Sequence, residues 1–360
     1  MLNAMNSKIL FCGGGTLGPV TPLLAVLRRM REMRPTLKFS WIGTPQGPEA
    51  PLVQAEGAAF HALPVAKLAR YPSVNWLAFP FAYLTALREA RKILEHEHPS
   101  AIFSAGGYTQ VPVMRVAAKN KIPCAVHQLD YTPLLSNKAV AKQCRLVTVS
   151  FGYPVSPFGA HVKTVRVATP CRFAGIPTPE RAAAATILGF NPDKPVVFIT
   201  GGGTGAVALN QAVWEILDEL LGQTQVLHLT GQGKMSGAPR REGYKAFEFF
   251  NETQMLNAYS AAVLVVSRGG FGSLSELAAL SKPSIIVPLP DSPQNQNVRI
   301  LGKGIVTVEQ SGHFATKLKN SILELLRDRQ KRENLGHALH ELLPTDNGSE
   351  LAGRWLELLD

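Results

Sequence analysis

The sequence is poor in cysteine and has no long hydrophobic run. Its 360 residues include only four cysteines, Cys12, Cys124, Cys144 and Cys171, which lie far apart and form no Cys-x-x-Cys pair. We therefore expect reduced, buried thiols in a cytosolic protein rather than a disulfide framework. No stretch of 18 or more apolar residues occurs, and the first apolar run ends in glycines at residue 13, so neither a membrane-spanning helix nor a signal peptide is expected.

Acidic residues are scarce in the first half of the chain. Residues 1–165 hold 18 Lys and Arg against 7 Asp and Glu, whereas residues 166–360 hold 19 of each kind. The whole net charge of +11 therefore belongs to the first half, and such a surplus favours an anionic partner, either nucleic acid or a membrane surface. No nucleic-acid-binding motif accompanies the charge, so we expect no nucleic acid partner.

Residues 65–94 favour the membrane surface. Aromatic and aliphatic residues lie here between basic ones, and the candidates for a membrane-facing patch are Trp76, Phe79, Phe81 and Arg88. Rings that enter the headgroup layer, flanked by Lys and Arg that meet lipid phosphates, make a peripheral contact with an anionic bilayer. The same aromatics would also suit the core between helices, and both interpretations stay open.

Strand-like runs alternate with helix-like stretches, a pattern typical of parallel sheets with helical crossovers. Because 360 residues exceed the usual limit of one hydrophobic core, two domains are expected. The predicted fold class is α/β, with two Rossmann-like domains whose parallel sheets face each other across a cleft. The expected boundaries are 1–167, 168–345, and a C-terminal helix within 346–360 that packs back on the first domain.

One strand-and-glycine pattern occurs twice. An apolar run leads into Gly-Gly-Gly-Thr at residues 13–16 and again at 201–204. A strand that feeds a glycine turn and then a helix presents free backbone N–H groups and the positive end of a helix dipole, which suit a phosphate. Such turns also join strands to helices for packing reasons alone, but one in each half predicts two nucleotide-type domains.

Five loops at expected strand ends resemble, in order and spacing, those of the MurG family of N-acetylglucosaminyltransferases, which have the GT-B fold. The loops are 14–26, 104–112, 126–141, 168–172 with 201–211, and 267–280 with 291–297. The resemblance implies a C-terminal domain that binds UDP-N-acetylglucosamine and an N-terminal domain that binds a polyprenyl-pyrophosphate-linked N-acetylmuramyl-peptide. It implies a peripheral, cofactor-independent enzyme of peptidoglycan synthesis at the cytoplasmic face of the cell membrane, converting lipid I to lipid II.

The resemblance assigns the donor site to the C-terminal loops. The turn 268–273 opens a helix whose amides would meet the diphosphate, and Glu276 would accept ribose hydroxyls. The alternative for Glu276 is a first-turn carboxylate favoured by the helix dipole. The implied donor-binding residues are Arg172, Gly203, Thr204, Gly205, Phe250, Arg268, Phe271, Gly272, Ser273, Leu274, Ser275, Glu276, Gln294 and Asn297.

Individual roles follow from the family motifs. Arg172 matches the arginine of the NPxR element, where a guanidinium suits a phosphate, although a solvated linker charge is the alternative. Gln294 and Asn297 match amides that read sugar hydroxyls, with solvated turn residues as the alternative. Phe250 corresponds to the stretch that packs on uracil. Gly203 and Thr204 replace a serine and a glutamine of the family, so the hydroxyl moves by one residue.

The acceptor side departs from the family pattern. Pro19 replaces the histidine of the GGTGGH loop, and the HEQN element ends here in Asp130. Since proline cannot take a proton, Asp130 becomes the first candidate for the catalytic base and His127 the second. A turn-capping Asp130 and a hydrogen-bonded core His127 are the alternatives. The implied acceptor and phosphate contacts are Thr16, Leu17, Gly18, Gly106, Gly107, Tyr108 and Lys138.

No metal is implied, because no Asp-x-Asp pair follows a strand and no His/Cys cluster is present, so helix dipoles and Arg172 are expected to meet the leaving-group charge. Two other functions stay open: a GT-B transferase with a different lipid-linked acceptor, and an inactive sugar-nucleotide-binding homologue. A nicotinamide-dependent dehydrogenase is disfavoured, because residues 43–46 offer no ribose-binding acid after the second strand.

Overall fold

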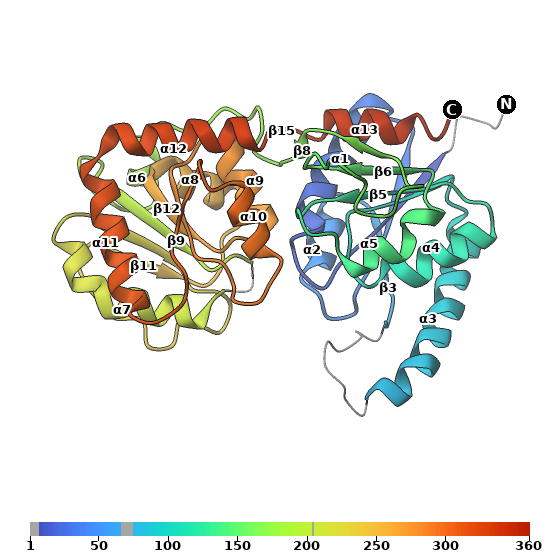
Figure 1. The fold of residues 1–360 in the computed structure, drawn as a ribbon, viewed down its shortest axis with the longest axis horizontal. Coiled ribbons are helices and arrows are strands. Elements are labelled where there is room, and N and C mark those ends of the chain that lie inside the picture. The colour runs from blue at the N-terminus through green and yellow to red at the C-terminus, as the bar shows by residue number, and fades with distance from the viewer. Residues whose placement is uncertain (1–6, 66–74, 204) are drawn as a thin grey trace. The chain divides into compact units, whose positions relative to one another are not determined.

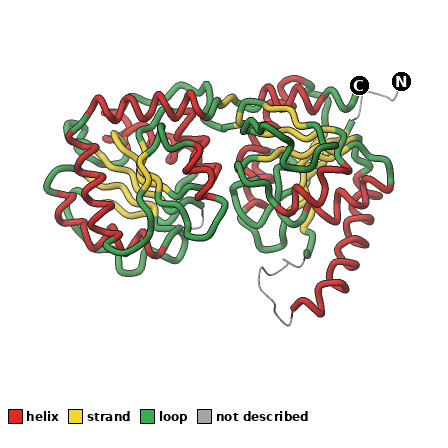
Figure 2. Tube along the Cα trace, viewed as in Figure 1, coloured by secondary structure: helices red, strands yellow, loops and turns green. Residues whose placement is uncertain are grey.

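The computed structural model describes residues 7–65, 75–203 and 205–360. The chain forms two units, the first from residues up to Arg172 together with Asp346–Asp360, and the second from Phe173–Thr345. In each unit a parallel sheet lies inside a layer of helices (Figures 1 and 2). The α/β class with two parallel-sheet domains is therefore confirmed.

The first unit is built on a seven-stranded parallel sheet in the order β3-β2-β1-β4-β5-β6-β7. Its strands are β1 (Lys8–Cys12), β2 (Lys38–Gly43), β3 (Ala59–Ala62), β4 (Ala101–Ser104), β5 (Cys124–Gln128), β6 (Leu146–Val149) and β7 (Thr164–Arg166). Its helices are α1 (Val20–Met33), α2 (Glu49–Ala55), α3 (Asn75–Glu97), α4 (Gln110–Lys119), α5 (Leu135–Val140) and α13 (Ser349–Leu356). The central strands are buried along nearly their whole length, as strands covered on both faces must be.

The last helix of the chain completes the core of the first unit. Helix α13 packs on α1 and inserts the fully buried Trp355, whose ring stacks on Phe103 at 4.7 Å and lies 6.4 Å from the ring of Phe11. Two short strands, β8 (Thr169–Pro170) and β15 (Thr345–Asp346), pair with each other. The C-terminal segment is therefore part of the first hydrophobic core rather than a tail.

The second unit is built on a six-stranded parallel sheet in the order β11-β10-β9-β12-β13-β14. Its strands are β9 (Val196–Thr200), β10 (Gln225–Leu229), β11 (Tyr244–Phe247), β12 (Ala262–Ser267), β13 (Ser284–Ile286) and β14 (Val306–Thr307). Its helices are α6 (Arg181–Ile187), α7 (Val207–Leu221), α8 (Glu252–Ala261), α9 (Phe271–Ala279), α10 (Gln294–Ile300), α11 (Phe314–Arg327) and α12 (Arg329–Leu342). Aliphatic residues of the sheet, α7 and α11 form one core.

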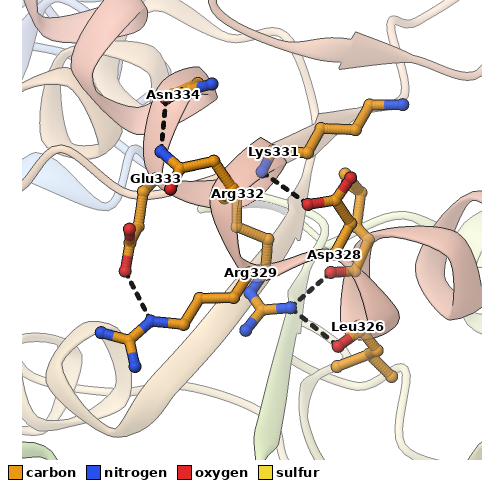
Figure 3. Close-up of polar contacts among 9 residues, drawn as sticks. Leu326, Asp328, Arg329, Lys331, Arg332, Glu333 and Asn334 are labelled. Atoms are coloured by element: carbon orange, nitrogen blue, oxygen red, sulfur yellow. Dashed lines mark hydrogen bonds and ion pairs between the residues drawn. The ribbon is translucent and has the colours of Figure 1, made fainter.

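The corner between α11 and α12 shows how side chains end one helix and begin the next (Figure 3). The Asp328 carboxylate caps α12 by accepting the Lys331 N–H at 2.8 Å, and the Arg332 guanidinium donates to the carbonyls of Leu325 and Leu326 at the end of α11. These bonds satisfy backbone groups that helix ends leave without intrahelical partners. The turn between the two helices is thereby fixed.

The strand order reverses once in each sheet, between β1 and β4 in the first and between β9 and β12 in the second. In open parallel sheets such a reversal opens a crevice at the carboxyl ends of the strands, where ligands bind. The glycine-rich loops that follow these four strands, at 13–18, 105–109, 201–206 and 268–270, all lie at the reversals. The topology therefore places the loops singled out in the sequence at the two expected binding positions.

Candidate active site

Three loops of the first unit meet at its strand reversal. A Cβ on Gly107 would lie 3.3 Å from the Gly14 nitrogen, and one on Gly106 would lie 2.7 Å from Cδ1 of Leu134. The Tyr108 ring covers Gly15, since a Cβ there would lie 3.2 Å from its Cε1 atom. The structure thus brings the predicted residues of the loops at 13–18 and 105–108 together, against the segment that follows β5.

The remaining predicted acceptor contacts differ in exposure. Thr16 is exposed, Leu17 and Gly18 are half-buried, and Lys138 is exposed on α5. Pro19 precedes the first residue of α1, and the Leu17 carbonyl accepts the first hydrogen bonds of that helix. The strand, loop and helix succession therefore persists with proline at this position.

His127 is fully buried and held at both ring nitrogens. Nδ1 lies 3.0 Å from the Thr148 hydroxyl, and Nε2 lies 3.0 Å from the Ser150 hydroxyl. Burial lowers the pKa of this imidazole to about 3. These contacts favour the interpretation of His127 as a hydrogen-bonded core histidine over a role as base.

Asp130 follows β5 and is half-buried. Its backbone carbonyl accepts hydrogen bonds from Gln128 Nε2 at 2.7 Å and from the Tyr153 hydroxyl at 3.3 Å. Gln128 is itself held by Asn137, whose Nδ2 donates to Gln128 Oε1 at 2.7 Å. Burial raises the pKa of the Tyr153 phenol, and the nearby Tyr131 and Asp130 add to the shift. The backbone that carries this carboxylate is therefore fixed by its neighbours.

In the second unit, α9 begins directly at the strand reversal. Its N-cap is Gly270, which offers no side-chain cap, so the first-turn amides of Gly272 and Ser273 have no side-chain acceptor there. Such an uncapped helix start suits a phosphate. Leu274 and Ser275 are buried, and the Ser275 hydroxyl donates to the Gly272 carbonyl at 2.8 Å, so these residues hold the turn rather than present side chains.

Glu276 lies in the second turn of α9, and the first turn holds no acidic residue. The alternative of a first-turn carboxylate is therefore wrong. Its side chain is 7 % exposed and accepts a hydrogen bond of 2.8 Å from the Tyr259 hydroxyl. Phe271, at the start of the helix, is also buried.

The two predicted amides of α10 lie in different surroundings. Gln294 is half-buried, accepts the Leu289 N–H at 2.9 Å, and lies so close to the glycine turn that a Cβ on Gly269 would be 3.2 Å from its own Cβ. Asn297 is fully buried, which favours a structural role. Gln294 therefore lies beside the start of α9, whereas the buried Asn297 presents no exposed side chain there.

Arg268 is buried beneath the same turn. Its guanidinium donates to the Val287 and Pro288 carbonyls and, at 2.8 Å, to Oε1 of Gln310. Burial lowers the pKa of this guanidinium. With these acceptors in place, Arg268 anchors the loop after β13 within the second unit.

The loop after β9 adds a cation that the sequence did not single out. Gly203 is exposed, Thr204 lies outside the described residues, and the Gly205 carbonyl accepts a hydrogen bond of 3.3 Å from Lys234 Nζ. Lys234 follows β10 in Gly-Gln-Gly-Lys, a stretch that carries no family motif quoted above. Its ammonium group therefore lies beside a predicted phosphate loop.

Two further donor residues stay predictions. Phe250 is 5 % exposed and packs on Phe247 at 4.9 Å between ring centroids, whereas the neighbouring Phe249 is 52 % exposed. A uracil ring would meet Phe249 more readily than Phe250. Arg172 is half-buried at the end of the first unit.

The aromatic segment forms part of α3, whose first turns extend beyond the rest of the first unit (Figure 1). Phe81 is 75 % exposed, Arg88 is exposed, and Phe79 stacks on Tyr83 at 6.0 Å. The side chain of Trp76 lies outside what the structure describes. Phe81 is thus not a core residue.

Among the described residues no helix is both long and apolar enough to cross a bilayer.

Three residues at these sites were not predicted from the sequence: Glu49, Tyr259 and Lys234. Glu49 is fully buried and accepts the Gly15 N–H at 3.2 Å, and Tyr259 reaches Glu276 from α8. All three belong to no repeated pattern, and their partners are distant in sequence. Only the spacing of Gly-x-Glu at 47–49 after a strand gave a local signal.

Across the described residues, no group of three or more His, Cys, Asp or Glu side chains is placed to hold a metal ion.

Comparisons with known proteins agree with this geometry. Family models for the N-terminal and C-terminal domains of glycosyltransferase family 28 match residues 9–149 and 196–343. The chain is 36 % identical over 289 residues to the UDP-N-acetylglucosamine–N-acetylmuramyl-(pentapeptide) pyrophosphoryl-undecaprenol N-acetylglucosamine transferase of Clostridium tetani, covering 79 % of this chain and 78 % of that protein. It is 36 % identical over 288 residues to the protein of that name from Lachnospira eligens, with 78 % of each covered.

Among solved structures, MurG of Acinetobacter baumannii superimposes with a TM-score of 0.73 at 21 % identity, covering 98 % of this chain and 99 % of that chain. This likeness supports the GT-B fold. The two family models and the relatives at 36 % identity extend over most of the sequence. The chain therefore belongs to glycosyltransferase family 28, within its MurG group.

Proposed function

We propose that this enzyme transfers N-acetylglucosamine from UDP-N-acetylglucosamine to an undecaprenyl-pyrophosphate-linked N-acetylmuramyl-peptide, the step from lipid I to lipid II. The relatives at 36 % identity carry a name that states this reaction. The single structural observation that carries the proposal is the placement of glycine-rich loops at both strand reversals, one per unit. A transfer between a nucleotide diphosphate and a lipid diphosphate needs two such phosphate positions.

The donor diphosphate would lie at the start of α9. Backbone amides of Gly272 and Ser273 and the helix dipole would stabilise the negative charge that grows on UDP as the sugar leaves. Glu276, fixed by Tyr259, would accept a ribose hydroxyl, and Gln294 would read the sugar. Lys234 and Arg172 would supply positive charge to the phosphates. We propose no metal and no cofactor for this step.

The acceptor would lie against the loops at 13–18 and 105–108. Its attacking hydroxyl forms the new bond to the anomeric carbon as the bond to UDP breaks, with inversion, and its proton must go to a base. Asp130 is the candidate for this base because it is a half-buried carboxylate at the end of β5 with a fixed backbone. His127 is assigned to the core.

The enzyme would work at the cytoplasmic face of the cell membrane as a peripheral protein. The exposed Phe81 and Leu84 on α3, with the exposed Arg88 on the same helix, support a contact in which rings enter the headgroup layer and the guanidinium meets lipid phosphate. The surplus of basic residues in the first half supports an anionic surface.

A turnover assay tests the proposal directly. Purified protein is incubated with UDP-N-acetylglucosamine and the lipid-linked N-acetylmuramyl-pentapeptide in detergent, with and without a chelator, and UDP release and the disaccharide product are measured. We expect equal amounts of both products under both conditions. Binding of UDP in calorimetry without any product would instead support an inactive homologue.

A different lipid-linked acceptor is the second candidate, because Pro19 and Asp130 change the acceptor side while the donor loops persist. Complementation of a strain depleted of its own transferase separates the two candidates. Growth is expected if the acceptor is lipid I. UDP release with other polyprenyl-linked sugars, but not with lipid I, would favour the second candidate.

A further inference from the structure

Glu49 is a fully buried carboxylate that connects two loops of the first unit. Its Oε1 atom accepts hydrogen bonds from the Thr44 N–H and the Thr44 hydroxyl, each at 2.6 Å. The Gly15 N–H donates to both carboxylate oxygens at 3.2 Å. The side chain therefore ties the loop after β1 to the loop after β2.

Burying a carboxylate is costly unless its oxygens are hydrogen-bonded or its charge is paired. Among the residues the structure describes, Glu49 forms no ion pair with a Lys or Arg, so three donor groups on two residues compensate its charge. A buried charge without a counter-ion is normally avoided. The arrangement indicates that the position of the tied loop, rather than stability alone, depends on this side chain.

The local sequence makes room for the carboxylate. A Cβ on Gly14 would lie 2.0 Å from Glu49 Oε1, and a Cβ on Gly47 would lie 2.0 Å from Glu49 Oε2. Both positions must be glycine while Glu49 keeps this place. On the other side of the loop, Trp41 Nε1 donates to the Gly13 carbonyl at 2.8 Å.

The tie leaves the next three amides unused. Within the described chain, the N–H groups of Thr16, Leu17 and Gly18 have no hydrogen-bond acceptor, and Thr16 is exposed. Successive unpaired amides at the end of a strand and the start of a helix form a concave anion site. Their direction is set by Gly15, the residue that Glu49 holds.

We propose that Glu49 is a positioning residue that fixes the loop at 13–18 so that its amides bind a phosphate of the lipid-linked acceptor. The inference rests on the proposed function and deepens it. Glu49 does not touch the acceptor. It acts through Gly15. The hydrogen bonds that Glu49 accepts from Gly15 and Thr44 offset its negative charge, so that this charge does not repel the phosphate.

The test is Glu49→Gln. With the amide oxygen at the Oε1 position, both bonds from Thr44 persist. The amide nitrogen at the Oε2 position then faces the Gly15 N–H, donor against donor, so the hold on Gly15 is reduced to the single 3.2 Å contact with an uncharged oxygen. We expect the KM for the lipid-linked acceptor to rise by about tenfold to a hundredfold, the range for a lost hydrogen bond to a charged group, with the KM for UDP-N-acetylglucosamine unchanged. Hydrogen exchange of the amides at 14–18 should accelerate.

Glu97→Gln is the matched control. Glu97 is a buried carboxylate of the same unit, but it pairs with Lys8 at the opposite end of β1, 3.3 Å away. Its variant should lose stability while keeping the native acceptor KM and the native exchange at 14–18. Equal effects of both variants on the acceptor KM, or a Glu49→Gln protein with native exchange in the loop, would overturn the inference.

Failure of the proposed function is distinguishable from failure of this inference. If the native protein does not turn over the lipid-linked acceptor, the kinetic comparison has no baseline, and the proposed function fails. The exchange measurement still tests whether Glu49 holds the loop. Native exchange rates in Glu49→Gln would overturn the inference whatever the acceptor.

Discussion

The Tyr259 hydroxyl donates a hydrogen bond of 2.8 Å to the Glu276 carboxylate, across a buried contact between α8 and α9. Helix α8 begins in a capping box, in which Asn251 and Gln254 exchange hydrogen bonds with each other's backbone. The cap fixes the start of the helix that carries Tyr259. One oxygen of Glu276 is thereby oriented, so that under the proposed function the carboxylate would meet a ribose in a single arrangement.

Tyr259→Phe should weaken donor binding without changing the KM for the acceptor. Removing the hydroxyl leaves the Glu276 oxygen without this donor, and we expect the KM for the UDP-sugar to rise by about tenfold. Initial rates at varied donor and fixed acceptor concentration measure the effect. Tyr244→Phe is the control, because its hydroxyl contacts His228 and Trp214 elsewhere in the same unit. An unchanged donor KM in Tyr259→Phe would refute the role of Glu276.

Asp130→Asn should abolish turnover and leave donor binding intact. The amide cannot receive the proton of the attacking hydroxyl, and we expect kcat to fall by about a hundredfold to ten-thousandfold. Single-turnover assays and calorimetry with UDP separate the two effects. Asp218→Asn, an exposed surface change, controls for general loss of charge. A fully active Asp130→Asn enzyme would show that another group serves as base.

Phe81→Ser with Leu84→Ser should reduce binding to anionic vesicles. Both side chains are exposed on α3, and losing two apolar groups from a lipid contact should weaken partitioning by about tenfold or more. Co-sedimentation with phosphatidylglycerol vesicles measures the change. Val155→Ser removes an equally exposed apolar residue of the same unit and should have no effect. Equal loss in both proteins would place the membrane contact elsewhere.

Acid should destabilise the protein through two buried histidines. Burial lowers the pKa of His127 to about 3 and that of His228 to about 4, against an ordinary value of 6.5. Below pH 6.5 the unfolded chain therefore binds more protons than the folded one. The free energy of unfolding should fall by up to about 1.4 kcal/mol per pH unit for each histidine.

Chemical unfolding between about pH 7 and about pH 5 measures this slope. His127→Gln and His228→Gln should each flatten it. The two variants act on different units, so their effects should appear in different unfolding transitions if the units unfold separately. A variant with the native slope would mean that the histidine is protonated in the folded protein.

Much of the fold was predictable because its signals are local. The apolar run at 196–200, which is followed by glycines, predicts a strand with those bounds, and β9 (Val196–Thr200) has them. The edge strands β3, β7, β11 and β14 were not predicted, because short strands with mixed polar faces resemble loops. The sequence predicts a helix over 83–97, whereas α3 already begins at Asn75 and contains Pro80, a residue that usually ends a helix.

The candidate site divides in the same way. The glycine loops and Glu276 lie in contiguous motifs, so the sequence alone was enough to propose them. Residues whose role depends on contacts between distant segments were not, because Glu49 meets Gly15 34 positions earlier and Tyr259 meets Glu276 17 positions later. From the sequence His127 was a candidate for the catalytic base, because only the fold reveals Thr148 and Ser150 at its two ring nitrogens.

The insertion of Trp355 into the first core has a consequence for biosynthesis. Residues leave the ribosome in sequence order. The sheet that begins with β1 at Lys8 therefore lacks helix α13 until the entire second unit has been synthesised. The amino-terminal half therefore remains an unfinished intermediate until residues 349–356 have been synthesised. Deletion of residues 349–360 should leave the second unit folded and make the first unit sensitive to proteolysis.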